Sequence, residues 1–106
     1  MTDAELLDAL RDCYDPLLRR NIVEMNLVRS ATLELDTEAP GANIRGVPSR
    51  YKAHIVLIAP GSDEAANAQL AAQVENRLAG MQEISRANVR LLPAAFPILN
   101  QRRNPS

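Results

Sequence analysis

The stretch YKAHIVLIAPGSDEAANAQLAAQVENRLAGMQEISRANVRLL, residues 51–92, decides the fold. Its opening segment is strongly apolar and predicts a central strand over residues 51–59. A Pro-Gly turn follows, and an alanine-rich segment predicts a helix from Asp63 to Leu78, with Gly80 as the residue just beyond the helix. A last strand is predicted over residues 84–92. Strand, helix and strand in this order indicate two parallel strands joined by a right-handed crossover.

The hydrophobic pattern within this unit predicts which faces are buried. Apolar residues recur every four positions along the predicted helix and form a narrow stripe that would pack on the sheet. The stripe consists of Ala66, Leu70, Val74 and Leu78. In the last strand, apolar residues alternate with polar ones, so we expect one buried and one wet face. The apolar set is Ala87, Val89 and Leu91, and the polar set is Arg86, Asn88 and Arg90.

A second helix is predicted near the N-terminus. Thr2 and Glu5 have the spacing of a capping box, which predicts a helix over about residues 3–13. The helix would end at Asp15-Pro16, because the residue before a proline is pushed out of the helical region. Asp15 is also suited to close a turn through its own side chain.

A further strand is predicted between this helix and the central strand. Residues 21–28 form a short apolar segment that enters the strand, in which Ala31, Leu33 and Leu35 would share the buried side. A long loop, residues 37–50, would then return the chain as an antiparallel hairpin. The predicted fold is α/β: a two-layer sandwich with a small mixed sheet of three to four strands and two main helices on one face.

The composition fits an ordinary globular domain and favours no bulk electrostatic partner. The 106 residues are 46% hydrophobic and carry a net charge of −1. We therefore expect one domain over residues 1–92 and a proline-containing tail over residues 93–106. The only aromatic residues are Tyr14, Tyr51 and Phe96, too few for a base-stacking surface, so no nucleic acid is expected as a partner. The arginines that follow Glu83 are interpreted as a solvated strand face and tail.

The chain has one cysteine, Cys13, which excludes an intrachain disulfide and a multi-cysteine metal site within one chain. A buried small hydrophobe is the expected role of Cys13. The first residues lack the pattern of a signal peptide, and no apolar run has the ~20 residues that span a bilayer. We expect a cytoplasmic protein without a membrane partner.

Ser62 stands at the predicted strand-to-helix turn, a position that suits three different roles. As a helix N-cap, its hydroxyl would accept a hydrogen bond from a free backbone N–H. As part of an anion site, it would be opposed by the acids Asp63 and Glu64. As a nucleophile it would need a base, and the only histidine, His54, lies too far along the strand. The cap is therefore the predicted role of Ser62, and a polar strand-edge position is predicted for His54.

Two stretches carry a resemblance to a known family: LLDALRDCYDPLLRRNIVEMNLV, residues 6–28, and AHIVLIAPGSDEAANAQLAAQVENRLAGMQEISRANVRL, residues 53–91. Together they resemble the SufT/PaaD-like metal–sulfur cluster assembly family. Its members show a helix, an Asp-Pro-Glu with an Asn-Ile-Val-Asp-Leu-Gly-Leu-Val type segment, a strand ending in Thr-x-Pro-Gly-Cys-Pro, a helix and a final strand. The resemblance covers about residues 5–92. It implies the same α/β fold and a non-enzymatic role in iron–sulfur cluster assembly or maturation.

The departures from the family pattern shape the functional hypothesis. The family's reactive cysteine falls on Ser62, the proline after it on Asp63, and the glutamate of Asp-Pro-Glu on Leu17. An iron–sulfur cluster is the cofactor that the resemblance implies, but a serine hydroxyl is a far poorer iron ligand than a thiolate. We therefore expect an adaptor or scaffold that acts on other assembly or client proteins, with a second copy of the chain as a further partner to consider.

The resemblance also selects the candidate site residues. By family position they are Asp15, Asn21, Asn26, Ser62 and Asp63, with Cys13 as the thiol to consider. No catalytic residue and no metal ligand is expected. The alternative hypothesis is a protein-interaction or regulatory module that keeps only the fold and uses loop 37–50 or the basic tail.

Overall fold

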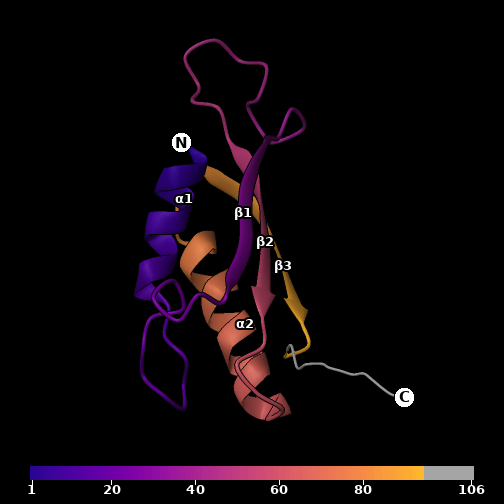
Figure 1. Cartoon of the computed structure of the whole chain (residues 1–106). Coiled ribbons are helices and arrows are strands. Elements are labelled where there is room, and N and C mark those ends of the chain that lie inside the picture. Colours follow the sequence, from indigo (N-terminus) through magenta and orange to yellow (C-terminus); the bar gives the residue numbers. More distant parts are fainter. Residues whose placement is uncertain (95–106) are drawn as a thin grey trace, which may run out of the picture.

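The computed structural model describes residues 1–94, and Figure 1 shows their arrangement. The elements in chain order are α1 (Asp3–Ala9), a short 3₁₀ helix η1 (Leu10–Asp12), β1 (Val28–Leu35), β2 (Tyr51–Ile58), α2 (Glu64–Ala79) and β3 (Ile84–Leu92). Of the predicted tail, residues 95–106 lie outside the described part of the chain.

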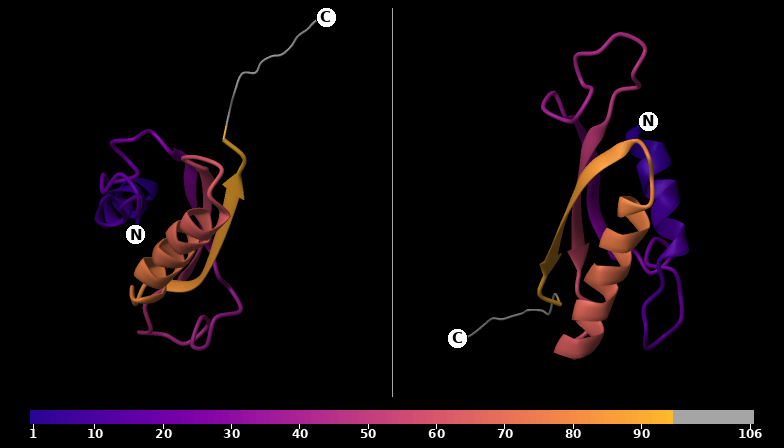
Figure 2. Two further views of the ribbon diagram at one scale, coloured as in Figure 1. Left: turned by 90° about the horizontal axis from the view of Figure 1, so that it is seen from below. Right: turned by 180° about the vertical axis from the view of Figure 1, so that it is seen from behind.

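Within residues 1–94 the sheet has three strands in the order β1-β2-β3. β2 pairs antiparallel with β1 and parallel with β3, as the sequence predicts. Both helices lie on the same side of this sheet when the molecule is viewed along the strands (Figure 2). The predicted class, an α/β two-layer sandwich with a small mixed sheet, is therefore confirmed.

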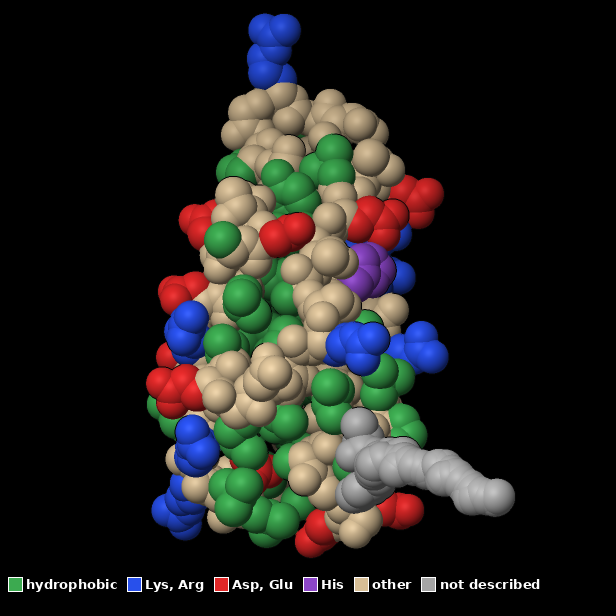
Figure 3. All heavy atoms as spheres, viewed as in Figure 1, with side chains coloured by type: hydrophobic (Ala, Val, Ile, Leu, Met, Phe, Trp, Pro, Cys, Tyr) green, Lys and Arg blue, Asp and Glu red, His purple; other side chains and the backbone are tan. Residues whose placement is uncertain are grey.

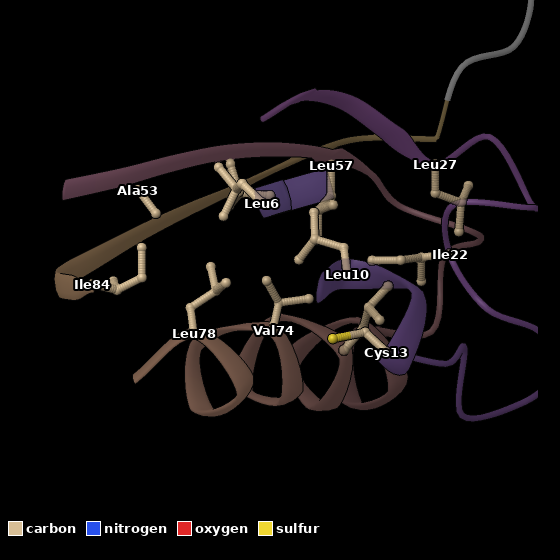
Figure 4. Packing of buried hydrophobic residues seen from close by; sticks show 12 residues of the cluster. Leu6, Leu10, Cys13, Ile22, Leu27, Ala53, Leu57, Val74, Leu78 and Ile84 are labelled. Atoms are coloured by element: carbon tan, nitrogen blue, oxygen red, sulfur yellow. The ribbon is translucent and has the colours of Figure 1, made fainter. Parts of the chain in front are cut away.

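The core lies between the sheet and the two helices (Figure 4). Alternate residues of β2, namely Ala53, Ile55 and Leu57, are buried, because successive side chains of a strand point to opposite faces. The four residues of the predicted α2 stripe, Ala66, Leu70, Val74 and Leu78, are all buried against them. Leu6 and Leu10 of the N-terminal helices complete the layer. Burial of these side chains supplies the main stabilising free energy of the fold.

The other face of the sheet is left open by the helices. His54 lies on this face of β2, and its Nε2 is 2.8 Å from Oε1 of Glu34 on β1. The prediction of a strand-edge position for His54 is wrong, because β2 is the central strand of the sheet. Basic and acidic side chains surround the histidine in the space-filling view (Figure 3). The polar residues predicted for β3, Arg86, Asn88 and Arg90, are exposed here as expected.

The N-terminal helix begins as predicted and ends earlier than predicted. Thr2 and Glu5 form the full capping box, with the Thr2 hydroxyl accepting from Glu5 N at 3.1 Å and the Glu5 carboxylate accepting from Thr2 N at 2.8 Å. The α-helix stops at Ala9, and one 3₁₀ turn carries the chain to Asp12. The helix does not reach Asp15-Pro16, because Cys13 is already extended and its carbonyl accepts from Ile22 N at 3.0 Å.

Two other sequence predictions need correction. Leu35 is 51% exposed rather than buried. The backbone N–H of Leu33 donates to Oδ1 of Asp3 at the start of α1, so Leu35 lies beyond the end of the helix layer. Gly80 is the C-cap of α2, with a right-handed φ of −78°, and so it does not occupy the C′ position just beyond the cap that the sequence predicts. The segment over residues 21–28 enters β1 as predicted, through a series of turns with Asn26 at φ of 60°.

The long hairpin loop between β1 and β2 is present as predicted and projects from the end of the sheet opposite to the start of α2 (Figure 1). Gly41 and Gly46 have φ of 83° and 87°, values that only glycine adopts without strain. Two apolar side chains of this loop are exposed, Ile44 by 62% and Val47 by 40%.

Candidate functional site

A hollow of about 350 Å³ lies at the end of the molecule where α2 begins. Its lining comes from Asp15, Leu17 and Leu18 in the loop after η1, and from the turn Pro60–Asp63 with Ala66 and Asn67 of α2. These two segments lie far apart in the sequence, and the fold brings them together because α1 and α2 cover the same face of the sheet (Figure 2). Three of the candidate residues, Asp15, Ser62 and Asp63, therefore share one site.

Asp15 closes the loop through its own side chain, as predicted. Its Oδ2 accepts a hydrogen bond from the backbone N–H of Leu18 at 2.7 Å, and its carbonyl accepts from Arg19 N at 2.8 Å. Asp15 is only 1% exposed, yet its second oxygen, Oδ1, has no hydrogen-bond partner among residues 1–94. A buried polar atom without a partner costs free energy, so this oxygen is an unusual feature of the site.

The N-cap of α2 is Asp63 and not Ser62, which corrects the sequence prediction. Oδ1 of Asp63 accepts from the backbone N–H of Ala66 at 3.1 Å, and the helix begins at Glu64. A carboxylate satisfies a free N–H and also complements the positive end of the helix dipole, an advantage that a serine hydroxyl lacks. The helix consequently begins one position later than predicted.

Ser62 is exposed on the turn that leads into α2. Its hydroxyl makes no hydrogen bond within the described part of the chain, and His54 is paired with Glu34 on the open face of β2. The turn is held instead by Asn67, whose Nδ2 donates to the carbonyl of Gly61 at 3.1 Å. The Ser62 side chain is thus free to contact a molecule at the hollow.

Two exposed leucines stand beside Asp15 in the hollow. Leu17 is 64% exposed and Leu18 is 61% exposed, and among the large apolar side chains of residues 1–94 only Ile44, at 62%, is exposed to a similar extent. Sequence reasoning noted Leu17 only as a departure from the family pattern and missed Leu18. The available signal was the pair of leucines between Pro16 and Arg19, inside a turn that has no core face.

Asn21 and Asn26 do not line the hollow. Oδ1 of Asn21 accepts from the backbone N–H of Glu24 at 2.8 Å and so closes the next turn. Asn26 occupies the left-handed region, which asparagine tolerates better than most residues. In this structure both asparagines shape the chain between the loop and β1.

Cys13 is fully buried in the core, as predicted for a small hydrophobe. Figure 4 shows its sulfur turned into the core between the N-terminal helices and α2. Burial raises the pKa of the Cys13 thiol and outweighs the nearby Arg77 guanidinium, which lowers it. The thiol is accordingly kept protonated and shielded from the hollow.

A second buried acid, Asp36 at the end of β1, provides a contrast with Asp15. Both of its oxygens are paired: Oδ2 accepts from the Ser85 hydroxyl at 2.6 Å and Oδ1 accepts from Glu38 N at 3.0 Å. The hydrogen bond from Ser85 is the largest cause that lowers the pKa of Asp36. Asp36 thus has the full set of donors that Asp15 lacks.

The donors at the hollow do not fit an iron–sulfur cluster. Asp15, Ser62 and Asp63 offer hard oxygen ligands, whereas clusters are held by soft thiolates. Among residues 1–94 there is no group of three or more His, Cys, Asp or Glu side chains placed to hold a metal ion. Over the same residues, neither helix has both the length and the apolar character needed to cross a bilayer.

Comparison with known proteins adds no assignment: no family model, no curated protein and no solved structure matches the chain.

Proposed function

We propose that this protein is a non-enzymatic factor of the iron–sulfur cluster assembly or maturation type, which works as an adaptor or scaffold. One observation carries the proposal. The two segments that bear the resemblance to the SufT/PaaD-like family, around Asp15-Pro16 and around Ser62, line the same hollow. Segments that are remote in the sequence and share a resemblance would be expected to meet if they served one function.

The chemistry of the hollow favours contact with a partner over ligation of a cluster. Ser62 stands where the family has its cysteine, and a serine hydroxyl stays protonated near neutral pH. The one thiol of the chain, Cys13, is buried away from this surface. In the proposal, the cluster is therefore the cargo of the partner proteins, and the hollow is where one of them docks.

Leu17 and Leu18 supply the apolar part of that docking surface. Fully burying a leucine contributes about 1.5–3 kcal/mol, and each of these side chains is close to two-thirds exposed in the free protein. Covering both would contribute roughly 2–4 kcal/mol to binding before the entropic cost of association.

The direct test is capture of iron–sulfur assembly proteins from an anaerobic extract by the tagged full chain. The double variant Leu17→Ser/Leu18→Ser should lose the captured proteins, because it removes the apolar contact. The matched control is Ile44→Ser/Val47→Ser, which changes two exposed apolar residues at the opposite end of the molecule and should retain them. Capture of no assembly protein by the wild type would reject the proposed function.

Ser62→Cys provides a second test of the same site. After anaerobic iron–sulfur reconstitution, the proposal expects no cluster absorption for the wild type and absorption for Ser62→Cys, since the thiolate restores a soft ligand at the hollow. A wild-type cluster that disappears in Cys13→Ala would instead make Cys13 a ligand and contradict the adaptor role.

A second candidate is a protein-interaction or regulatory module that keeps only the fold. It is favoured by the exposed Ile44 and Val47 in loop 37–50, a loop longer than most connections in globular domains. The two candidates predict opposite results in the capture experiment. If captured proteins are lost in Ile44→Ser/Val47→Ser and retained in Leu17→Ser/Leu18→Ser, the loop is the binding surface.

A further inference from the structure

We propose that the hollow binds a basic side chain, arginine or lysine, that a partner protein presents between apolar residues. The inference rests on the proposed function only for the identity of that partner. The chemistry of the recognised group follows from the unpaired carboxylate oxygen of Asp15 and from the side chains around it.

Asp15 Oδ1 is the observation that requires a donor. The residue is 1% exposed, and this oxygen has no hydrogen-bond partner within residues 1–94, while Oδ2 is used by Leu18 N. A buried acceptor without a donor is disfavoured, and a carboxylate without a compensating charge is disfavoured more strongly. A ligand that donates to Oδ1 would remove this cost on binding.

The other polar groups of the hollow also call for a donor. Ser62 offers a hydroxyl oxygen, and Asp63 uses only Oδ1 for the α2 cap among the described residues. The one side-chain amide of the lining, Asn67, is already bonded to the Gly61 carbonyl. None of the ion pairs within residues 1–94 involves Asp15 or Asp63, although Arg19 and Asp15 line the same neighbouring hollow. A cationic donor matches the two carboxylates of the lining, Asp15 and Asp63.

The exposed leucines beside Asp15, namely Leu17 and Leu18, favour a cationic donor that has an apolar stem. Arginine and lysine carry a long apolar stem below the charged group, and such stems pack along apolar surface. Leu17 and Leu18 provide this surface beside Asp15. A hollow of about 350 Å³ is within the usual range of ligand pockets, roughly 300–1,000 Å³, and admits a single side chain with its neighbours. Hydrophobic side chains gather over this end of the molecule in Figure 3.

The test is an NMR titration of the ¹⁵N-labelled full chain with the peptide acetyl-Leu-Arg-Leu-amide. The structure predicts saturable shifts at the backbone amides of Leu18 and Ala66, which bond to the Asp15 and Asp63 carboxylates. The same peptide with lysine should also bind, and the peptide with neutral citrulline should bind at least 10-fold more weakly. Equal shifts with citrulline, or no shift at these amides, would overturn the inference.

Asp15→Asn is the matching variant, because it keeps an acceptor for Leu18 N and removes the charge. Asp15→Asn should weaken the binding of the arginine peptide at least 10-fold and leave the affinity for the citrulline peptide unchanged. Leu17→Ser, at an exposed residue outside the core cluster, is a second variant that should weaken the binding of both peptides. Unchanged affinity for the arginine peptide in Asp15→Asn, in a spectrum that remains dispersed, contradicts the inference.

The chain's own tail is the competing occupant, since Arg102 and Arg103 follow β3 in the sequence. If Arg102→Ala/Arg103→Ala alone moves the Leu18 amide in the absence of peptide, the tail occupies the hollow and the partner-protein inference is wrong. These measurements contain no assembly protein. Peptide binding without capture of assembly proteins would reject the proposed function alone, and capture without peptide binding would reject this inference alone.

Discussion

The start of α2 depends on one carboxylate, that of Asp63, and a matched set of variants can measure its contribution. Asp63→Ala removes the acceptor that Ala66 N uses at 3.1 Å. Ser62→Ala, at the preceding position, removes a hydroxyl that has no hydrogen bond within residues 1–94. Asp63→Ser keeps an acceptor at the cap and removes the charge.

The expected loss follows from two contributions. Replacing an N-cap aspartate by alanine costs about 1 kcal/mol, within a range of about 0.5–2 kcal/mol. The negative charge beside the first turn adds roughly 0.3–1 kcal/mol at low ionic strength, because it complements the helix dipole. We expect Asp63→Ala to lose about 1.5 kcal/mol, Asp63→Ser a few tenths, and Ser62→Ala to remain within about 0.5 kcal/mol of wild type.

The assay is urea unfolding followed by far-ultraviolet circular dichroism, repeated at low and high salt. In thermal unfolding of a domain of this size, the same loss of about 1.5 kcal/mol corresponds to a fall in Tm of roughly 6–12 °C. High salt should reduce only the part of the effect that comes from the charge. If Ser62→Ala destabilises the protein as much as Asp63→Ala, Ser62 is the cap and the description of the hollow is wrong.

Three further predictions concern the buried acid at the end of β1, the buried thiol and the exposed leucines. The pKa of Asp36 is lowered in the folded protein, so the ionised carboxylate stabilises the fold at pH values above its unfolded pKa. This contribution is lost as the pH falls through the folded pKa. Asp36→Asn should therefore reduce the fall in the free energy of unfolding at acid pH, measured by urea unfolding at a series of pH values. Cys13 should react with a thiol reagent far more slowly in buffer than in urea, since the thiol is buried and its pKa is raised; equal rates would contradict its placement. Leu17→Ser/Leu18→Ser should change the free energy of unfolding by no more than about 1 kcal/mol, because neither side chain is in the core; a larger loss in urea unfolding would assign them a structural role.

The sheet and the α2 packing could be predicted because the pattern that specifies them is local. The alternation in β2 and the four-residue repeat of α2 each depend on which residues are apolar, and burial follows directly from those patterns. The capping box at Thr2 was equally readable, since its two hydrogen bonds join residues three positions apart. The exposure of Leu35 could not be predicted in this way, because it depends on where α1 begins relative to β1.

The candidate site was less accessible to sequence reasoning. Resemblance selected Asp15, Ser62 and Asp63, but their meeting in one hollow depends on the packing of the two helices on one face of the sheet. Serine and aspartate are both good N-cap residues, so the sequence Ser62-Asp63 is compatible with two helix starts that differ by one position. The pattern alone does not decide between them. The unpaired state of Asp15 Oδ1 depends on the positions of all neighbouring donors.

The binding inference depends most directly on one property, the absence of a donor to Asp15 Oδ1 among residues 1–94. The decisive measurement is the free energy of unfolding of Asp15→Asn relative to wild type at pH 7, with Asp36→Asn as the control. If Oδ1 has no donor, Asp15→Asn should retain or exceed the wild-type stability, while Asp36→Asn, which disrupts a carboxylate with two donors, should be destabilised. A loss in Asp15→Asn as large as the loss in Asp36→Asn would mean that Asp15 depends on its charge as strongly as a carboxylate with two donors, and it would contradict the account.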